Sequence, residues 1–226
     1  MIQSLINLIF PKYCNVCREV LLKNENMICN SCIHDLPFTH LLEQQSSKLL
    51  LKFYGILEIE NAYSIFYFHK IGVMQQLIHQ LKYKNNQELG VVFGKYYATV
   101  IQKNQLHFQA IIPVPLHPKK LKERGYNQLT TFGKSMAQIL DIPFIEDVLI
   151  RNTYNQTQTK KNRLQRIESL EKQKIFSIIN QEKVTNKHVL LIDDVITTGA
   201  TLIQCGKELK TIDGLKLSIV TICMAE

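Results

Sequence analysis

Two carboxylates stand side by side at the end of an apolar run in this 226-residue sequence. Asp193 and Asp194 follow four apolar residues and precede the segment Thr197–Thr201, which reads Thr-Thr-Gly-Ala-Thr. Adjacent acids in such a place are costly to remove from water unless a cation or hydrogen-bond donors meet them. The pair therefore indicates a site rather than a solvated surface.

The residues after the pair have the composition of a phosphate-binding turn: Thr197, Thr198, Gly199, Ala200 and Thr201. Small and hydroxylated side chains at a helix N-terminus leave backbone N–H groups open to an anion. In a parallel α/β sheet, ligands bind beyond the carboxyl ends of the strands. A phosphate in the turn beside two acids indicates a phosphorylated sugar whose hydroxyls donate to the carboxylates. A divalent metal would help to bring this anionic ligand near them.

Four cysteines form two C-x2-C pairs, Cys14 with Cys17 and Cys29 with Cys32. Each pair can present two thiolates, and two pairs complete a tetrahedral zinc site. Two disulfides are the alternative, which suits a cytoplasmic chain less well. A closed four-thiolate site leaves no position for a substrate, so we expect a structural zinc ion on which the segment depends for folding.

The remaining histidines and cysteines near apolar patterns are expected to have no part in the metal site. His34 and His40 lie close to the four-cysteine segment and are interpreted as bystanders. Cys205 and Cys223 stand alone within apolar patterns and are interpreted as core residues.

The formal net charge of +8 is unevenly distributed, since residues 1–60 carry −1 and the rest +9. This favours an anionic partner such as phosphates or nucleic acid, with solubility as the competing explanation. The longest apolar run has seven residues, far short of the roughly 20 that span a bilayer. The first residues lack a basic region and a small-residue cleavage site. We expect a cytoplasmic protein without a membrane span.

Apolar strand patterns alternate with helical ones, which predicts an α/β fold with a mainly parallel sheet. The expected strands are 62–68, 110–114, 144–149, 189–192 and 217–223. The expected helices lie within 72–86 and at 89–104, 127–140 and 200–212. We expect residues 1–55 to form the small zinc-ribbon-like module with its linker, and residues 56–226 to form the α/β domain.

The stretch Val189–Thr201 resembles the thirteen-residue signature of type I phosphoribosyltransferases, which bind 5-phosphoribosyl-1-pyrophosphate (PRPP) with Mg²⁺. The resemblance implies that Asp193 and Asp194 contact the ribose 2- and 3-hydroxyls. It also implies that Thr197–Thr201 cradle the 5-phosphate. The expected fold is then a type I phosphoribosyltransferase-like core.

Two further stretches are similar to blocks of the ComF-type competence proteins, also called the amidophosphoribosyltransferase-like family. Ile111–Gln128 matches the P-V-P-L-H…R-G-[FY]-N-Q block, and Thr157–Arg166 resembles the second basic loop of that family. Together with the four cysteines, the resemblance covers nearly the whole chain in the right order.

The basic blocks supply candidates for contact with pyrophosphate. Backbone N–H groups around Leu116 and His117 follow the strand 110–114, and Arg124 is the preferred side chain nearby. A solvated face is the competing interpretation of the basic run, which also contains Lys119, Lys120 and Lys122. In Arg151–Arg166, an expected loop running into a helix, the candidates are Arg163 and Arg166, with Lys160 and Lys161 beside them. Such loops close over substrate, although a solvated face fits these residues equally well.

The sequence departs from related families in three places. It begins Met1-Ile2 without the catalytic cysteine of glutamine amidotransferases, so we reject glutamine-dependent ammonia transfer. No base-reading segment is identified after the signature, so an acceptor pocket is expected from His69–Asn86. The basic loop has Arg166 followed by Ile-Glu-Ser, where the family often has Arg-x-x-Asn.

Three interpretations remain open. The first is a transferase in which an acceptor attacks the anomeric carbon of PRPP and pyrophosphate leaves. The second is a protein of natural transformation that binds incoming single-stranded DNA, with a competence helicase or recombination mediator as partner; Lys82, Tyr83, Lys84 and Tyr126 support it weakly. The third is a non-catalytic PRPP sensor.

Overall fold

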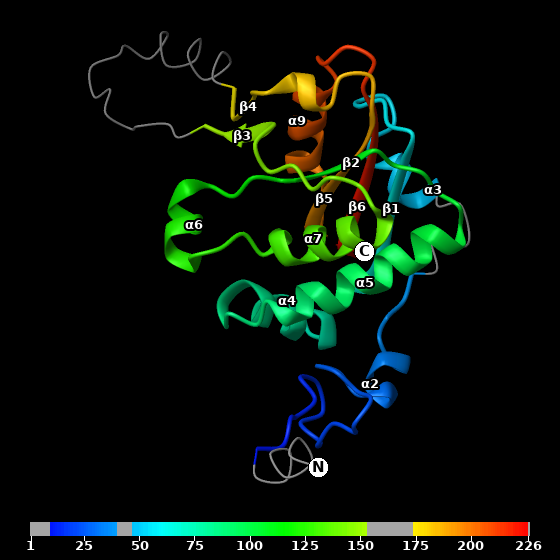
Figure 1. The fold of residues 1–226 in the computed structure, drawn as a ribbon, viewed down its shortest axis with the longest axis vertical. Coiled ribbons are helices and arrows are strands. Elements are labelled where there is room, and N and C mark those ends of the chain that lie inside the picture. The colour runs from blue at the N-terminus through cyan, green and yellow to red at the C-terminus, as the bar shows by residue number, and fades with distance from the viewer. Residues whose placement is uncertain (1–9, 40–46, 153–173, 226) are drawn as a thin grey trace.

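A four-stranded parallel sheet forms the centre of the computed structural model, which describes residues 10–39, 47–152 and 174–225. Its order is β1-β6-β5-β2, and every neighbouring pair runs parallel (Figure 1). The strands are β1 (Asn61–Phe68), β2 (Ala110–Pro113), β5 (His188–Ile196) and β6 (Lys216–Ala225). The predicted mainly parallel sheet is confirmed.

Helices cover both faces of this sheet. Gly133 in α7 (Leu129–Leu140) approaches Ile192, whereas Gly206 in α9 (Ala200–Leu209) approaches Leu217, the register partner of Val189. Because successive side chains of a strand point to opposite faces, α7 and α9 lie on opposite sides. On the α7 side lie α4 (Val73–Tyr83) and α5 (Glu88–Lys103), and α6 (Pro118–Arg124) stands at the margin (Figure 1).

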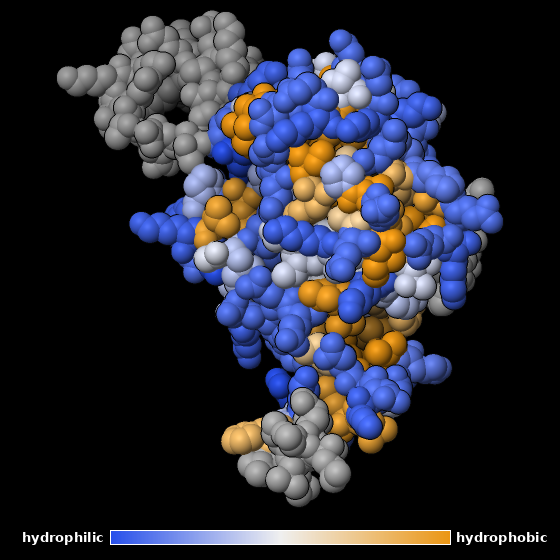
Figure 2. All heavy atoms as spheres, viewed as in Figure 1, coloured by the Kyte–Doolittle hydropathy of each residue, from blue (hydrophilic) through white to orange (hydrophobic). Residues whose placement is uncertain are grey.

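The central strands are apolar because both of their faces are covered. Val189, Leu190, Leu191 and Ile192 are fully buried, as is typical of parallel sheets between two helical layers. Hydrophilic residues cover most of the face in Figure 2, and hydrophobic residues gather near its middle and down toward the four-cysteine segment.

The four-cysteine segment, residues 12–39, lies at one end of the molecule and contains α2 (Asn30–His34). Tyr13 bridges Val20, and the segment ends beside the sheet, where Phe38 bridges Phe66 of β1. The next described element is α3 (Ser47–Leu51). The expected boundary between residues 55 and 56 stays a prediction.

The prediction of a strand at 144–149 is wrong. Phe144 forms a single parallel bridge to Ile111, and the strand that follows, β3 (Leu149–Arg151), pairs antiparallel with β4 (Phe176–Ile178) in a separate small sheet. The apolar pattern indicated that Phe144 and Leu149 face the core, where Phe144 is half-buried and Leu149 buried, but it could not indicate that the chain changes its strand partner between them. A 3₁₀ turn, η1 (Gln181–Lys183), leads from β4 toward β5.

Several element ends also differ from the prediction, and two of them bear on the site. β5 continues four residues beyond Ile192, so both aspartates lie inside the paired strand. Helix α7 begins at Leu129 because Asn127 Oδ1 accepts a hydrogen bond from the Leu129 N–H at 3.0 Å. Across the described ranges, no helix is both long and apolar enough to cross a membrane.

Candidate functional site

The pleat of β5 sends the two aspartates to opposite faces of the sheet. Asp193 is four residues from Val189 in the strand, so its side chain points to the same face, the α9 side. Asp194 is two residues from Ile192, so its side chain points to the other face, the α4 and α7 side. Adjacent carboxylates in the sequence therefore have different surroundings.

Asp193 lines a small pocket together with the residues of the phosphate-loop motif. The other lining residues are Val195, Ile196, Thr197, Thr198, Gly199, Ala200, Thr201 and Leu202. Its Oδ1 accepts a hydrogen bond from the Asp194 N–H at 2.8 Å. Burial first, and then the charge of Asp194, raise the pKa of Asp193 to about 7.

The loop meets this pocket at the N-terminus of α9. Gly199 is its N-cap and has φ +83°, a left-handed conformation that glycine adopts without a steric cost. The Thr197 and Thr198 side chains are exposed, whereas Gly199 is buried. The first N–H groups of a helix attract anions, so the loop can hold a phosphate, as the sequence predicts.

Asp194 is held by two side chains from other elements. Lys82 Nζ of α4 lies 2.9 Å from Asp194 Oδ1, and the Gln128 side-chain amide donates to Asp194 Oδ2. Asp194 is 5% exposed, so these contacts replace the water that the carboxylate loses. Neither partner of Asp194 was predicted from the sequence, although Lys82 lies in the segment expected to supply an acceptor pocket and Gln128 ends the Ile111–Gln128 block.

Arg124 belongs to the same network. Its guanidinium donates to Gln128 Oε1 at 2.7 Å and to the Tyr83 hydroxyl at 3.0 Å, and it lies 4.7 Å from the centre of the Tyr83 ring. A chain of contacts thus runs from Asp194 through Gln128 to Arg124 and Tyr83, joining β5, α6 and α4. Whether Arg124 contacts pyrophosphate stays a prediction.

The other predicted residues of the basic blocks divide into three groups. Leu116 and His117 are half-buried before α6, and His117 Nδ1 accepts from the Lys119 N–H at 3.1 Å, which caps that helix. The α6 lysines are exposed: Lys119, Lys120 and Lys122. Four candidates lie outside the described residues: Lys160, Lys161, Arg163 and Arg166.

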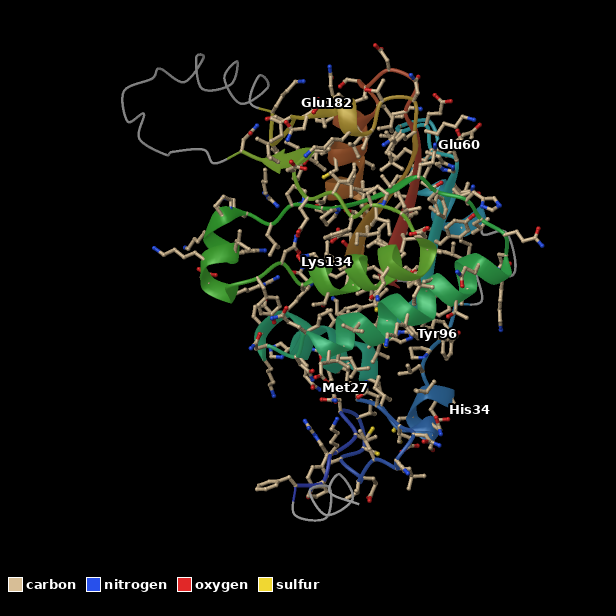
Figure 3. All side chains as sticks on the ribbon, viewed as in Figure 1. Met27, His34, Glu60, Tyr96, Lys134 and Glu182 are labelled. Carbon is tan, nitrogen blue, oxygen red and sulfur yellow. The ribbon has the colours of Figure 1, made fainter. Side chains whose placement is uncertain are left out.

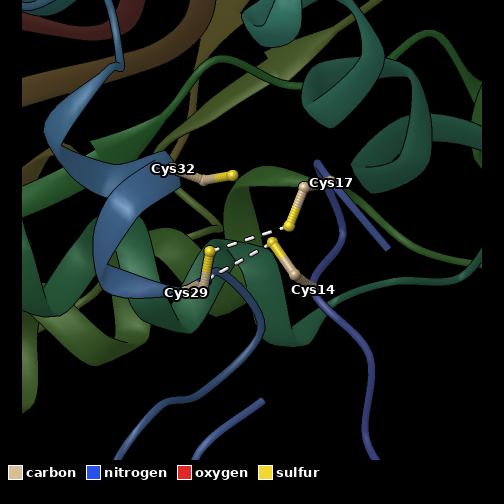
Figure 4. Close-up of side chains that lie close together, drawn as sticks. All are labelled: Cys14, Cys17, Cys29 and Cys32. Carbon is tan, nitrogen blue, oxygen red and sulfur yellow. Dashed lines mark hydrogen bonds between the residues drawn. The ribbon is translucent and has the colours of Figure 1, made fainter. Parts of the chain in front are cut away.

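The four cysteine sulfurs converge at one point, as Figure 4 shows. Their Sγ atoms all lie within 4.8 Å of one another, and Cys17 and Cys29 are 3.7 Å apart. Tetrahedral zinc with bonds of about 2.3 Å places sulfurs about 3.8 Å apart, so the cluster fits the ion. His34 instead lies beside Asp35, with Nδ1 and Oδ1 3.3 Å apart, and His40 lies outside the described residues.

The cysteine surroundings also suit a cation. Burial is the largest influence on Cys14 and raises its pKa, but N–H groups of Cys29 and Val16, each 3.4 Å from the sulfur, help to bring the pKa down to about 6. Burial and the neighbouring cysteines raise the pKa of Cys32 to about 12. Four adjacent thiols cannot all ionise without a positive charge among them, and a bound metal ion would supply it. Cys205 and Cys223 are fully buried, which confirms them as core residues.

Comparison with known proteins defines the class of the C-terminal part of the chain. Residues 130–226 match the family model "Phosphoribosyl transferase domain". This range contains β5, the phosphate loop and α9. With its mainly parallel sheet, the chain therefore has a type I phosphoribosyltransferase-like core, preceded by a four-cysteine cluster.

Curated relatives of this chain are named as competence proteins. The chain is 30% identical over 151 residues to Competence protein F of Haemophilus influenzae, covering 63% of this chain and 64% of the relative. It is 26% identical over 193 residues to Competence protein ComFC of Bacillus subtilis, covering 84% and 75%. The chain is thus similar to proteins named Competence protein F and Competence protein ComFC, and it spans slightly under two thirds of the Haemophilus relative.

Solved structures of phosphoribosyltransferases also match at low identity. Glutamine PRPP amidotransferase from B. subtilis is 15% identical with a TM-score of 0.41, over 62% of this chain and 30% of that one. Adenine phosphoribosyltransferase from Leishmania tarentolae is 14% identical with a TM-score of 0.40, over 74% and 94%.

Proposed function

We propose that this chain is a cytoplasmic PRPP-binding protein of the ComF type that acts in natural transformation. One observation carries the PRPP part of the proposal: Asp193 and the exposed threonines of the phosphate loop line the same pocket at the α9 N-terminus. The names of the curated relatives support the role in transformation.

On this proposal, each residue has a defined task. The N–H groups and hydroxyls of Thr197–Thr201 bind the 5-phosphate, and Asp193 accepts a hydrogen bond from a ribose hydroxyl. Asp194 is held by Lys82 and Gln128 and anchors α4 and α7 beside the ribose position, and its own contact with a ribose hydroxyl stays a prediction. Mg²⁺ would supply neutralising charge to the pyrophosphate when bound with PRPP.

Calorimetric titration of Mg²⁺–PRPP into the full chain tests the proposal. We expect micromolar binding that Asp193→Asn weakens at least tenfold, since a neutral amide replaces the accepting carboxylate. Lys183→Met, which removes a cation on the distant η1 turn, serves as the matched control and should bind as the wild type does. Absence of binding by the wild type would reject the proposal.

Turnover is a separate question with its own measurement. Pyrophosphate release from PRPP in the presence of candidate acceptors would assign a metabolic or nucleic-acid phosphoribosyltransferase. Binding without release would assign the non-catalytic sensor instead. A transferase and a sensor would both bind PRPP in the same pocket, so the titration that tests binding is done before this assay of turnover.

Single-stranded DNA is a second candidate ligand, favoured by the surface around α6. Its exposed Lys119, Lys120 and Lys122 lie on the helix that Arg124 links to Tyr83, an aromatic side chain that is 61% exposed. Alternating cations and aromatic rings suit a single strand. We expect binding that weakens steeply with salt, and a smaller salt slope when the three lysines become alanine. A competence helicase or recombination mediator would then be the protein partner.

A further inference from the structure

The segment after α3 packs against the phosphate loop, although it precedes the matched domain by more than 70 residues. Phe53 is 1% exposed, and its ring lies 3.7 Å from the position that a Cβ would take at Gly199. Leu57 contacts α9 at Gly206, where an added Cβ would lie 2.4 Å from Leu57 Cδ2. Residues 52–57 therefore support both the loop and the helix that follows it.

Lys52 makes the polar contact between this segment and the loop. Its Nζ donates a hydrogen bond to the Thr197 carbonyl oxygen at 2.9 Å. The side chain is half-buried, and the adjacent Phe53 is fixed in the core. The ammonium group is thus held beside the first residue of the phosphate-loop motif.

The charges around the pocket bear on what the Lys52 ammonium group does for a bound phosphate. Among the described residues that line the pocket, Asp193 is the charged side chain, and it is acidic. A phosphate monoester carries close to two negative charges at neutral pH, and a helix N-terminus supplies only about half a positive charge. A bound dianion would therefore meet more negative than positive charge unless a cation stands at the loop.

We propose that Lys52 is this cation: it fixes the Thr197 carbonyl and makes the site selective for a dianionic sugar phosphate. The inference rests on the proposed function, because it assigns a further residue to the same site. The assignment extends the sugar-phosphate site into residues 47–57, outside the range of the family match.

The test compares two isosteric ligands of different charge at pH 8. Ribose 5-phosphate is a dianion there, whereas ribose 5-sulfate is a monoanion, and calorimetry measures the affinity of each. Lys52→Met keeps the aliphatic stem and removes the charge, and Lys52→Arg keeps the charge. Lys48→Met, at an exposed lysine of α3, is the matched control.

We expect Lys52→Met to weaken binding of ribose 5-phosphate roughly tenfold or more, because a charge-assisted interaction is lost. The loss for ribose 5-sulfate should be several-fold smaller, Lys52→Arg should restore most of the difference, and Lys48→Met should change neither affinity. Equal weakening of both ligands would show that Lys52 only supports the loop, and an unchanged affinity for ribose 5-phosphate would also overturn the inference. If the wild-type protein bound neither ribose 5-phosphate nor PRPP, both the proposed function and the inference about Lys52 would fail.

Discussion

Lys82 and Asp194 form an ion pair whose two members differ in access to water. The Asp194 side chain is 7% exposed and the Lys82 side chain 22% exposed, with 2.9 Å between Nζ and Oδ1. Removing the lysine leaves a buried carboxylate whose one remaining side-chain donor among the described residues is the Gln128 amide, whereas removing the carboxylate leaves a lysine that can turn toward water. Lys82→Met should therefore destabilise the fold by about 2–3 kcal/mol, more than Asp194→Asn does.

Urea unfolding of both single variants and the double variant measures this coupling. The double variant should be less destabilised than the sum of the single ones by at least about 1 kcal/mol. Lys134→Met is the control, because the pair of Lys134 and Glu146 is exposed with 4.0 Å between its atoms. Its effect should stay within about 0.5 kcal/mol. Additive effects at Lys82 and Asp194 would contradict the pairing.

Asp193 should make stability depend on pH in the opposite direction to an ordinary surface carboxylate. Burial and Asp194 raise its pKa from 3.8 to about 7, so the folded protein binds this proton more tightly than the unfolded chain does. Stability therefore falls as pH rises from about 4 to 7, and Asp193→Asn removes this dependence. Between pH 5 and pH 8, the variant should gain about 2–3 kcal/mol relative to the wild type. Parallel stability profiles in urea unfolding would refute this.

At the residue scale, features that depend on local spacing could be predicted from the sequence, whereas contacts between residues of different elements could not. The two C-x2-C pairs predicted a cluster that the structure confirms, because the spacing within each pair is local. The contacts of Asp194 depend on Lys82, which is 112 residues away in the chain, and on Gln128. Periodicity and composition carry no information about such distant pairs.

Among the elements, α5 and α7 approach each other most closely where α5 carries glycine. A Cβ at Gly94 would lie 1.9 Å from Ser135 Oγ and 2.4 Å from the Phe132 carbonyl oxygen. The carbonyl belongs to the α7 backbone, so it cannot rotate away as a side chain can. Gly94→Ala should therefore destabilise by about 1–3 kcal/mol, although alanine favours helix formation.

Thermal or urea unfolding of Gly94→Ala checks this contact, with Lys95→Ala as the control on the exposed side of the same helix. The control should change stability by no more than about 0.5 kcal/mol. A stabilised Gly94→Ala would mean that helix propensity outweighs the close packing and that the helices can separate at little cost.

Hydrophobic periodicity and apolar runs predicted helices and strands correctly where the same pattern of buried residues continues through the whole element. β5 and β6 are buried on both faces, and their apolar runs located them. The stretch from Phe144 to Leu149 changes partner from β2 to β4, which an apolar pattern cannot reveal. Leu49 and Phe53 belong to the stretch expected to hold a helix or the linker before residue 56. Both are buried in the core, because α3 and the residues that follow it pack on the sheet and the phosphate loop.

At the scale of the whole molecule, the four-cysteine segment is joined to the α/β core through α4. Gln80 donates to the Asn15 carbonyl oxygen at 3.2 Å, and Asn86 donates to Asn15 Oδ1 at 2.9 Å. Figure 3 places Met27 at this junction, where its carbonyl oxygen accepts a hydrogen bond from the Asn15 side chain at 2.8 Å. Gln80 lies two residues before Lys82, so the junction is close to the network around Asp194.

Removing the metal should therefore separate the molecule into a disordered end and a folded core. The four-cysteine segment buries few large side chains of its own, so an ion bound by Cys14, Cys17, Cys29 and Cys32 would supply much of its folding free energy. The parallel sheet has its own buried core and should persist. After complete chelation, we expect rapid proteolysis within residues 12–39, a nearly unchanged circular dichroism signal from the core, and recovery of protection when zinc is restored. Cys32→Ser should reproduce the loss without a chelator, and an unchanged thermal melt after complete chelation would show that the segment folds without the ion.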